Sequence, residues 1–350
     1  MIYSITTLQG LENITRQEII TRFGDTERFK ILTRKPQRII FQYTGNPKDL
    51  LSIRTAEHLF IVIKHLPNMT RSRSSLANIK KSLTHHNFEK TLTCCRQVGI
   101  SIRKRIQFRV MSRMSGFRNF QKRELQQVIE RSLIDRGWYL TNSSGRLDVW
   151  VEMHGQDAYI SIKLSKPDFA QRSYKTEHVP NTLKPTIAAS MVHLSQPHPN
   201  DVFLDPMCGA GTILLERAFA GRYRYLIGGD ISTKAIIATQ KNFGRKHQPR
   251  HFFHWDAQSL PLQPNSIDKI LCNIPTKLED DNSSILTKLY NQVLSQFAIV
   301  LKSGGRIVLL SMQSDLLNRT LKQHNVLRTN QQIGINIGGK RGKILVVRKY

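Results

Sequence analysis

The sequence predicts an α/β protein whose C-terminal half forms a Rossmann-like, doubly wound parallel sheet. Two observations support this fold class. From Asp201 onward, runs that favour strands alternate with runs that favour helices, which is typical of a parallel sheet with crossover helices. A glycine-rich turn, "DPMCGAGT", joins the first of these strands to the first helix. The first 165 residues follow another pattern, in which helices are mixed with strand pairs, so we expect smaller α/β units there.

The N-terminal elements are predicted in order from periodicity and turn residues. Residues 1–45 predict a small unit with strands at 1–8, 28–34 and 38–45 and a helix at 11–23. Residues 46–165 predict a second unit, whose elements are a helix at 74–86, a strand at 107–114, a helix at 122–138 and a hairpin made by 147–155 and 157–165.

A linker and a C-terminal domain follow. Residues 166–185 contain three prolines and little periodicity, and they precede a helix that starts with Pro185. Residues 186–350 carry the alternating strands and helices of the parallel sheet. The last apolar run, "GKILVVRK" at 342–349, is predicted to be an edge strand, and "GKRGK" at 339–343 a basic hairpin turn.

Composition narrows the classes of protein. The chain of 350 residues is 39% hydrophobic, which suits two or three globular cores. No run approaches the roughly 20 apolar residues of a membrane span, and the N-terminus lacks the pattern of a secretory signal. The four cysteines show no C-x-x-C pairing, which favours the reducing cytoplasm.

The net charge indicates a polyanionic partner. Lys and Arg number 53 against 25 Asp and Glu, a formal charge of +28. Residues 51–123 hold 16 Lys or Arg and only Glu57 and Glu89, so half of the excess lies in a fifth of the chain. A solvated basic surface is the alternative, but concentrated positive charge destabilises a fold unless an anion neutralises it. Nucleic acid is therefore the expected partner.

Three acids are predicted to end successive strands of one sheet. Asp205 precedes the turn that contains Gly209 and Gly211, Asp230 ends the strand "YLIGGD", and Asp256 follows "HFFHW". A capping role is the alternative for each acid taken alone. Together they predict a nucleoside site, in which Asp230 accepts from ribose hydroxyls and Asp256 from an adenine amino group. His247, His251 and His254 are taken as surface histidines, so no metal site is expected.

The motif "DPMCGAGTILLE" resembles the first motif of class I S-adenosylmethionine-dependent methyltransferases. It is most similar to that of RNA methyltransferases that carry an N-terminal THUMP domain. Residues 108–165 resemble the second part of a THUMP domain, and residues 172–195 the segment before the catalytic fold. The resemblance implies a ferredoxin-like N-terminal unit at 1–45, a THUMP RNA-binding domain at 46–165, a linker at 166–185 and a class I methyltransferase domain at 186–350.

The resemblance also implies a cofactor, S-adenosylmethionine, and the residues that bind it. The residues expected at its methionine end are Asp205, Cys208, Gly209, Gly211 and Thr212. Those expected at its ribose and adenine are Asp230, Ile231, Asp256 and Ala257, and Asn273 is expected to bridge the cofactor and the target base.

The segment "LCNIPTK" at 271–277 carries the predicted chemistry. A guanine amino group is a poor nucleophile, and two acceptors that hold both of its hydrogens aim its lone pair at the methyl group. The Asn273 side chain and the Ile274 carbonyl would supply these acceptors, and Pro275 would fix the backbone. The family pattern ends in Phe or Tyr, which stacks on the base, whereas this chain has Thr276.

Three explanations for Thr276 stay open. Another aromatic residue (Phe117, Phe120 or Trp255) covers the base; the choice of substrate has shifted; or catalysis is lost and RNA binding remains. The acids after Lys277, in "KLEDDNSS", are also unusual beside a pocket for RNA.

The predicted function is S-adenosylmethionine-dependent formation of N2-methylguanosine in tRNA. The alternatives are an inert or scaffold tRNA-binding protein and the methylation of rRNA or of an adenine N6. The residues expected to contact RNA are Arg103, Lys104, Arg105, Arg113, Arg118, Lys122 and Arg123.

Overall fold

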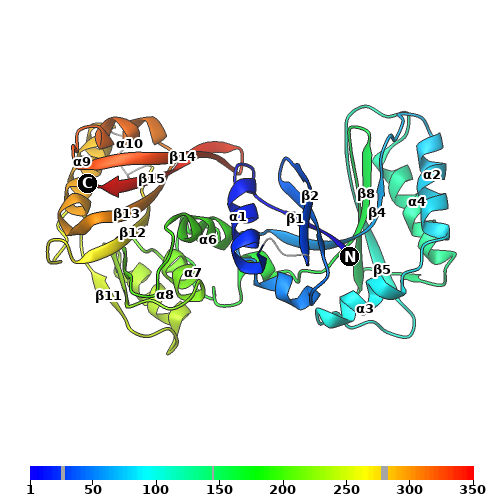
Figure 1. Ribbon diagram of the computed structural model, residues 1–350, viewed down its shortest axis with the longest axis horizontal. Coiled ribbons are helices and arrows are strands. Elements are labelled where there is room, and N and C mark those ends of the chain that lie inside the picture. Colours follow the sequence, from blue (N-terminus) through cyan, green and yellow to red (C-terminus); the bar gives the residue numbers. More distant parts are fainter. Residues whose placement is uncertain (25–27, 144–145, 277–282) are drawn as a thin grey trace. The chain divides into compact units, whose positions relative to one another are not determined.

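The computed structural model describes residues 1–24, 28–143, 146–276 and 283–350. The chain forms two compact units (Figure 1). Unit 1 consists of Met1–Thr6 and Ile19–Phe169, and unit 2 of Thr7–Glu18 and Ala170–Tyr350.

Within its described residues, unit 1 contains one eight-stranded sheet with the order β2-β3-β1-β4-β8-β7-β5-β6. Its strands are β1 (Ile2–Thr6), β2 (Phe29–Lys35), β3 (Arg38–Tyr43), β4 (His58–Leu66), β5 (Gln107–Ser115), β6 (Tyr139–Leu140), β7 (Leu147–His154) and β8 (Asp157–Lys163). β5 runs parallel to β6 and β7, and the other neighbours are antiparallel. The predicted hairpin of 147–155 and 157–165 is confirmed as β7 and β8.

The helices of unit 1 include α3, which the periodicity did not predict. They are η1 (Pro47–Ser52), α2 (Ser74–Thr84), α3 (Glu89–Gln97), α4 (Lys122–Ile134) and α5 (Asp168–Gln171), the last of which crosses into unit 2. One hydrophobic core runs through the unit, from Tyr3 on β1 to Phe169. The structure therefore joins β1–β3 and β4 in one sheet across the predicted boundary at residue 45, and the division into a ferredoxin-like unit and a THUMP domain stays a prediction.

Helix α1 (Glu12–Phe23) contributes to both units. Leu11, just before the helix, and Ile14 pack in the core of unit 2, whereas Ile19 packs in that of unit 1. The turn before α1 needs a glycine, because Gly10 has a φ of +96° and a Cβ there would lie 2.0 Å from the carbonyl oxygen of Gly334.

Unit 2 contains a seven-stranded sheet, among the described residues, with the order β11-β10-β9-β12-β13-β15-β14. Its strands are β9 (Val202–Asp205), β10 (Tyr225–Asp230), β11 (Arg250–His254), β12 (Ile267–Asn273), β13 (Leu301–Ser311), β14 (Leu327–Ile337) and β15 (Lys340–Lys349). β9 to β13 are parallel, and β15 pairs antiparallel with β13 and β14.

The predicted edge position of the last strand is wrong. β15 lies between β13 and β14, which explains why Ile344–Val347 are buried, and β14 forms the edge. The polar run "TNQQ" in β14 is exposed, and the apolar alternation of this strand is confined to Ile333, Ile335 and Ile337 in its second half. The predicted hairpin is confirmed, but its turn lies at Gly338 and Gly339, because Ile337 pairs with Lys340 and residues 340–343 already belong to β15.

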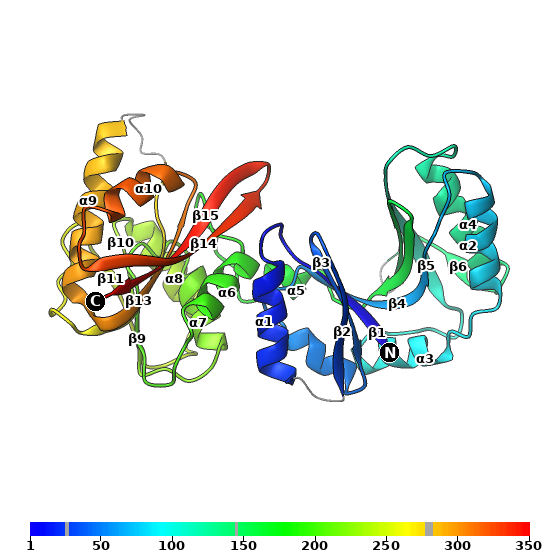
Figure 2. The same cartoon turned by 45° about the horizontal axis from the view of Figure 1, so that its top comes forward.

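Helices cover both faces of this sheet (Figure 2). Beside α1 and α5, the helices of unit 2 are α6 (Pro185–Leu194), α7 (Thr212–Phe219), α8 (Thr233–Phe243), α9 (Ser283–Val300) and α10 (Ser314–Leu321). Val308 and Leu310 of β13 pack in the core that includes α6 and α7, whereas Ile307 and Leu309 pack in the core that includes α9 and α10. This alternation confirms a doubly wound sheet. Across the described residues, no helix combines the length and apolar composition that a membrane span requires.

Candidate functional site

The predicted site residues meet at the carboxyl edge of the parallel sheet. Asp205, Asp230 and Asn273 are the last residues of β9, β10 and β12, and Asp256 follows the end of β11 by two residues. These four strands are neighbours in the order β11-β10-β9-β12. β10 and β11 lie on one side of β9, and β12 and β13 lie on its other side, so the strand order reverses between β9 and β12. Ligands of such sheets bind at this switch point, outside the carboxyl ends of the strands.

Asp205 is buried at 1% exposure. Burial raises the pKa of the Asp205 carboxyl well above the ordinary value, and the nearby charge of Asp230 raises it further. The Met207 N–H, which lies 3.4 Å from Oδ1, opposes this rise. A buried carboxyl of this kind favours a cationic neighbour, because a positive charge would stabilise its ionised form.

The glycine-rich turn brings backbone close to this edge. Gly209 and Gly211 have φ values of +53° and +76°, and α7 begins at Thr212, as predicted. A Cβ on Gly211 would lie 2.9 Å from Cγ2 of Thr239, so a side chain there would be strained and crowded. Around Gly209 the nearest atom to such a Cβ is Val179 Cγ2 at 3.6 Å, which leaves room for a ligand.

Two polar groups at the turn fit a bound nucleoside with a charged tail. The Thr212 hydroxyl is buried and has no hydrogen-bond partner among the described residues. Asp230 accepts from the Gly209 and Ser232 N–H groups, each at 2.9 Å, which uses two of about four acceptor positions on a carboxylate. The carboxylate thus stabilises the turn and retains capacity for ribose hydroxyls.

Residues that follow β9, β10 and β11 complete this edge of the sheet. Ile231, directly after Asp230, is 69% exposed and so presents an apolar surface beside this carboxylate. Asp256 accepts from the Gln258 side chain at 2.9 Å and is partly buried, and Ala257 is buried. Cys208 is also buried, and burial raises the pKa of its thiol.

The predicted linker is fixed to unit 2 by side chains that sequence analysis missed. Asn242 of α8 donates to the carbonyls of Ala210 (2.9 Å) and Glu177 (3.0 Å), and its oxygen accepts from the Glu177 N–H at 2.8 Å. The Tyr174 hydroxyl donates to Glu216 of α7 at 2.6 Å. Nothing in the helical pattern of α8 distinguishes Asn242 from a surface residue, so only its burial at 8% exposure reveals this role.

The Asn-x-Pro segment is held from three sides. Asn273 pairs with Leu310 in the sheet, and the Ile274 N–H donates to the Leu310 carbonyl at 3.1 Å. Ile274 is buried at 1% exposure. The hydroxyl of Tyr290, on α9, donates to the Pro275 carbonyl at 2.7 Å. Sequence analysis missed Tyr290, because an aromatic residue in an apolar helix pattern indicates core packing and not a hydrogen bond.

Two of the three aromatic residues considered as a cover for the target base do not present a face to one. Trp255 is 7% exposed and donates to the Pro206 carbonyl at 3.1 Å, and Phe120 is 4% exposed in the core of unit 1. Both alternatives are wrong for this reason, whereas Phe117 is 75% exposed. The acidic run at 279–281 lies outside the described residues.

The basic residues predicted to contact RNA differ in their surroundings. Arg103, Lys104, Arg105, Arg113, Lys122 and Arg123 are exposed. Arg118 instead donates to the carbonyls of Met69, Thr70 and Gly155, and it thereby fixes the loop that carries Phe117. Its role in binding RNA stays a prediction.

The three histidines weighed as ligands have separate partners. His251 contacts the Tyr225 hydroxyl, a ring nitrogen of His254 lies 2.8 Å from the Ile231 carbonyl, and His247 packs edge-on against Phe219. Among the described residues there is no group of three or more side chains suited to hold a metal ion.

The fold and the edge just described define unit 2 as a Rossmann-like methyltransferase domain. Residues 172–343 match the model of the UPF0020 family, which is described as an RMKL-like methyltransferase domain. The methyltransferase class predicted from the sequence is thereby confirmed.

Two curated relatives and one solved structure extend this result. The mouse tRNA (guanine(6)-N(2))-methyltransferase THUMP3 is 27% identical over 61% of this chain and 45% of its own length. The human U6 snRNA (guanine-N(2))-methyltransferase THUMPD2 is 31% identical over 58% of this chain and 40% of its own length. The chain thus spans less than half of each relative.

The solved structure of TrmN from Thermus thermophilus matches 100% of this chain and 99% of its own, with a TM-score of 0.84 at 22% identity. This likeness confirms the predicted fold class, an α/β protein in which a Rossmann-like domain follows another α/β region.

Proposed function

We propose that the protein is an S-adenosylmethionine-dependent RNA methyltransferase that forms N2-methylguanosine in tRNA. The observation that carries the proposal is the anchored Asn-x-Pro segment at the end of β12, in the same sheet edge as Asp205 and Asp230. Relatives named as guanine-N2 methyltransferases of tRNA and U6 snRNA support a guanine amino group in RNA as the target.

The residues at the edge fit the cofactor. Asp230 would accept from its ribose hydroxyls, the exposed Ile231 would pack on its adenine, and Asp256 and Ala257 would lie at the adenine rim. The buried Thr212 hydroxyl and the Gly209–Gly211 turn would receive the methionine end, near the carboxyl of Asp205. When bound, S-adenosylmethionine supplies an electrophilic methyl group on a sulfonium centre.

The chain's own part in catalysis is orientation. The Asn273 amide oxygen and the Ile274 carbonyl would accept the two hydrogens of guanine N2, which directs the nitrogen lone pair at the methyl group. Such an amine needs no strong base before transfer. Pairing with Leu310 and the Tyr290 hydrogen bond hold this segment in place in the free protein, so little ordering remains for the bound state.

The basic region of unit 1 would bind the RNA through its phosphates. Phosphate contacts position RNA without reading its sequence, and exposed arginines such as Arg103 and Arg123 suit this role. A cytoplasmic location belongs to the same proposal, and it is supported by four cysteines that are all free.

The test is the incubation of the full chain with labelled S-adenosylmethionine and unfractionated tRNA, followed by nucleoside mass spectrometry. Label in N2-methylguanosine is expected. Label in 6-methyladenosine would move the target to an adenine, and label in U6 snRNA but not in tRNA would change the RNA. Tight tRNA binding without label would support the competing hypothesis of an inert RNA-binding protein, which the absence of an aromatic ring at Thr276 favours.

A further inference from the structure

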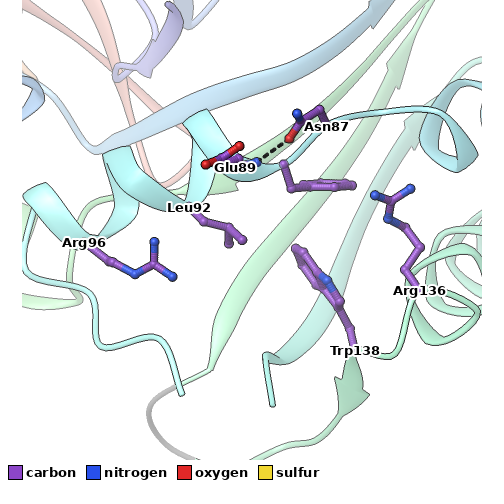
Figure 3. Close-up of a pocket in the computed structure, with 7 residues that line it drawn as sticks. Asn87, Glu89, Leu92, Arg96, Arg136 and Trp138 are labelled. Carbon is purple, nitrogen blue, oxygen red and sulfur yellow. Dashed lines mark hydrogen bonds between the residues drawn. The ribbon is translucent and has the colours of Figure 1, made fainter. Parts of the chain in front are cut away.

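A cavity of about 450 Å³ opens on the surface of unit 1, and none of the residues predicted to contact RNA lines it (Figure 3). Helix α3 lines one side of it with Glu89, Leu92 and Arg96, whose spacing of three and four residues places them on one face of the helix. Arg136 and Trp138, which follow α4, line the other side. The volume lies within the range of sites that hold small ligands.

The floor of this cavity is apolar and aromatic. The Phe88 and Trp138 rings lie 4.9 Å apart between centroids and are tilted by 59°, and both are nearly buried. Leu92 is partly exposed and lies between Arg96 and Trp138 in Figure 3. The two rings are too buried to present a face, so the accessible apolar surface consists of Leu92 and the exposed edge of Trp138, and a base can pack against it.

Two arginines border the floor. Arg136 is held in place, because its Nη1 donates to the Thr84 carbonyl at 2.6 Å and its guanidinium lies 5.1 Å from the centroid of the Phe88 ring. This hydrogen bond uses one of its two terminal nitrogens. Arg96 is exposed, and among the ion pairs of the described residues neither arginine has a carboxylate partner. The Glu89 carboxylate is directed away from Trp138 (Figure 3).

Lys64 and Arg136 place positive charge beside His86, near the cavity. His86 packs edge-on against Phe88 at 4.7 Å. Its pKa is lowered, first by burial and then by the charges of Lys64 and Arg136. Glu89 is the one acid among the lining residues, so positive charge remains in excess there, and a bound anion would reduce the repulsion between these like charges.

We propose that this cavity is a subsite for one unpaired nucleotide of the RNA, with its base against Leu92 and the edge of Trp138 and its two flanking phosphates on Arg96 and Arg136. The proposal rests on the proposed function, which makes RNA the substrate, and adds a place where one nucleotide is held outside the methyl-transfer site. The nucleotide must be unpaired, because a base in a helix is stacked and cannot reach an aromatic floor.

The test compares salt-dependent RNA binding of Arg96→Gln, Arg136→Gln and the double variant with that of Lys90→Gln. Lys90 is exposed on the same helix but does not line the cavity, so its variant controls for the loss of one charge. Binding of the full chain to unfractionated tRNA and to oligouridylate is measured by fluorescence anisotropy. Each lost phosphate contact is expected to lower the slope of log affinity against log salt by about 0.7. The double variant is expected to bind at least about tenfold more weakly.

A second measurement locates the base. RNA that contains 4-thiouridine is expected to cross-link, on irradiation, to the peptide that carries Trp138 in the wild-type chain, and less so in the double variant. If Arg136→Gln lowers the melting temperature, the Arg136→Lys variant, which keeps the positive charge, is used in its place. The proposal is overturned if the arginine variants have the same affinities and salt slopes as Lys90→Gln. It is also overturned if the chain binds polyglutamate through these arginines but does not bind oligouridylate.

The two proposals fail separately. If the wild-type chain methylates RNA but the arginine variants bind RNA as the control does, only the subsite proposal is refuted. If the wild-type chain transfers no methyl group but shows the expected salt slopes and cross-link, the proposed activity is refuted and the subsite is supported.

Discussion

Replacing Tyr290 by Phe tests whether anchoring of the Asn-x-Pro segment contributes to methyl transfer. Tyr290 is fully buried; its hydroxyl donates to the Pro275 carbonyl at 2.7 Å and lies 3.2 Å from Ser311 Oγ, which accepts from the Gln313 N–H. Burial raises the pKa of Tyr290 to about 12, so the hydroxyl remains a donor over the whole working pH range. Phe keeps the packing of the ring and removes only this donor.

The size of the effect follows from the cost of leaving the partly buried Pro275 carbonyl without a donor, at most about 1 to 3 kcal/mol. If the segment keeps its position, this cost lowers the free energy of unfolding, and the Tm of unit 2 falls by roughly 3 to 9 °C. If the segment moves toward solvent to satisfy its carbonyl, Asn273 and Ile274 lose their fixed orientation, and about 1 to 2 kcal/mol of lost orientation lowers kcat roughly five- to thirtyfold.

The assay separates these contributions. Initial rates with labelled S-adenosylmethionine and tRNA give kcat and KM, calorimetry gives the cofactor affinity, and a thermal melt gives stability. We expect a lower kcat, a nearly unchanged KM for RNA and an unchanged cofactor affinity. Tyr223→Phe is the matched control, since the Tyr223 hydroxyl is buried without a partner in the described structure. A Tyr290→Phe variant that equals this control in both kcat and Tm would refute the anchoring argument.

Four further changes test the site. Asp230→Ala is expected to weaken S-adenosylmethionine binding at least about tenfold in calorimetry, because it removes the ribose acceptor and frees the Gly209 N–H; Asp315→Ala, an exposed acid on α10, serves as control. Asn273→Ala is expected to abolish methyl incorporation and to leave cofactor affinity nearly intact, and normal transfer by this variant would contradict the mechanism. For Asp205 the raised pKa means that the ionised form is disfavoured in the folded state, so stability falls as the pH rises from the unfolded pKa of about 3.9 through the folded one. Asp205→Asn should therefore gain Tm over wild type as the pH rises in thermal melts, and a pH-independent difference would contradict the shift. Thr276→Phe is expected to lower KM for RNA about tenfold, with kcat unchanged, because a stacked base contributes about 1 to 3 kcal/mol; an unchanged KM would show that residue 276 does not face the base.

The strand ends could be predicted because local patterns determine them. Asp205, Asp230 and Asn273 each end an apolar run that is buried on both faces, and such runs stop where the chain leaves the sheet. Parallel strands then bring their carboxyl ends to one edge without any information about side-chain contacts. The glycine turn is equally local, since its left-handed φ angles restrict which residues fit.

The remaining features depend on contacts between distant segments. The position of β15 inside the sheet is decided by β14, a strand whose first half is polar and exposed and whose apolar alternation is short. Asn242 acts on a carbonyl 32 residues away, and its sequence neighbours contain no trace of that partner. Periodicity predicts which face of a helix is buried, but it does not predict which backbone group a buried polar atom will meet.

This difference bears on Thr276 and on how far the site depends on it. The orientation of the acceptors comes from pairing with Leu310 and from the Tyr290 hydrogen bond, and neither involves the side chain of residue 276. A missing aromatic ring therefore removes affinity for the flipped base and leaves the geometry of the acceptors intact. Contacts elsewhere on a basic protein can restore affinity, because binding energies from separate phosphate and base contacts add on one RNA. Loss of stacking at Thr276 is thus compatible with a working methyltransferase that relies more on unit 1 to hold its RNA.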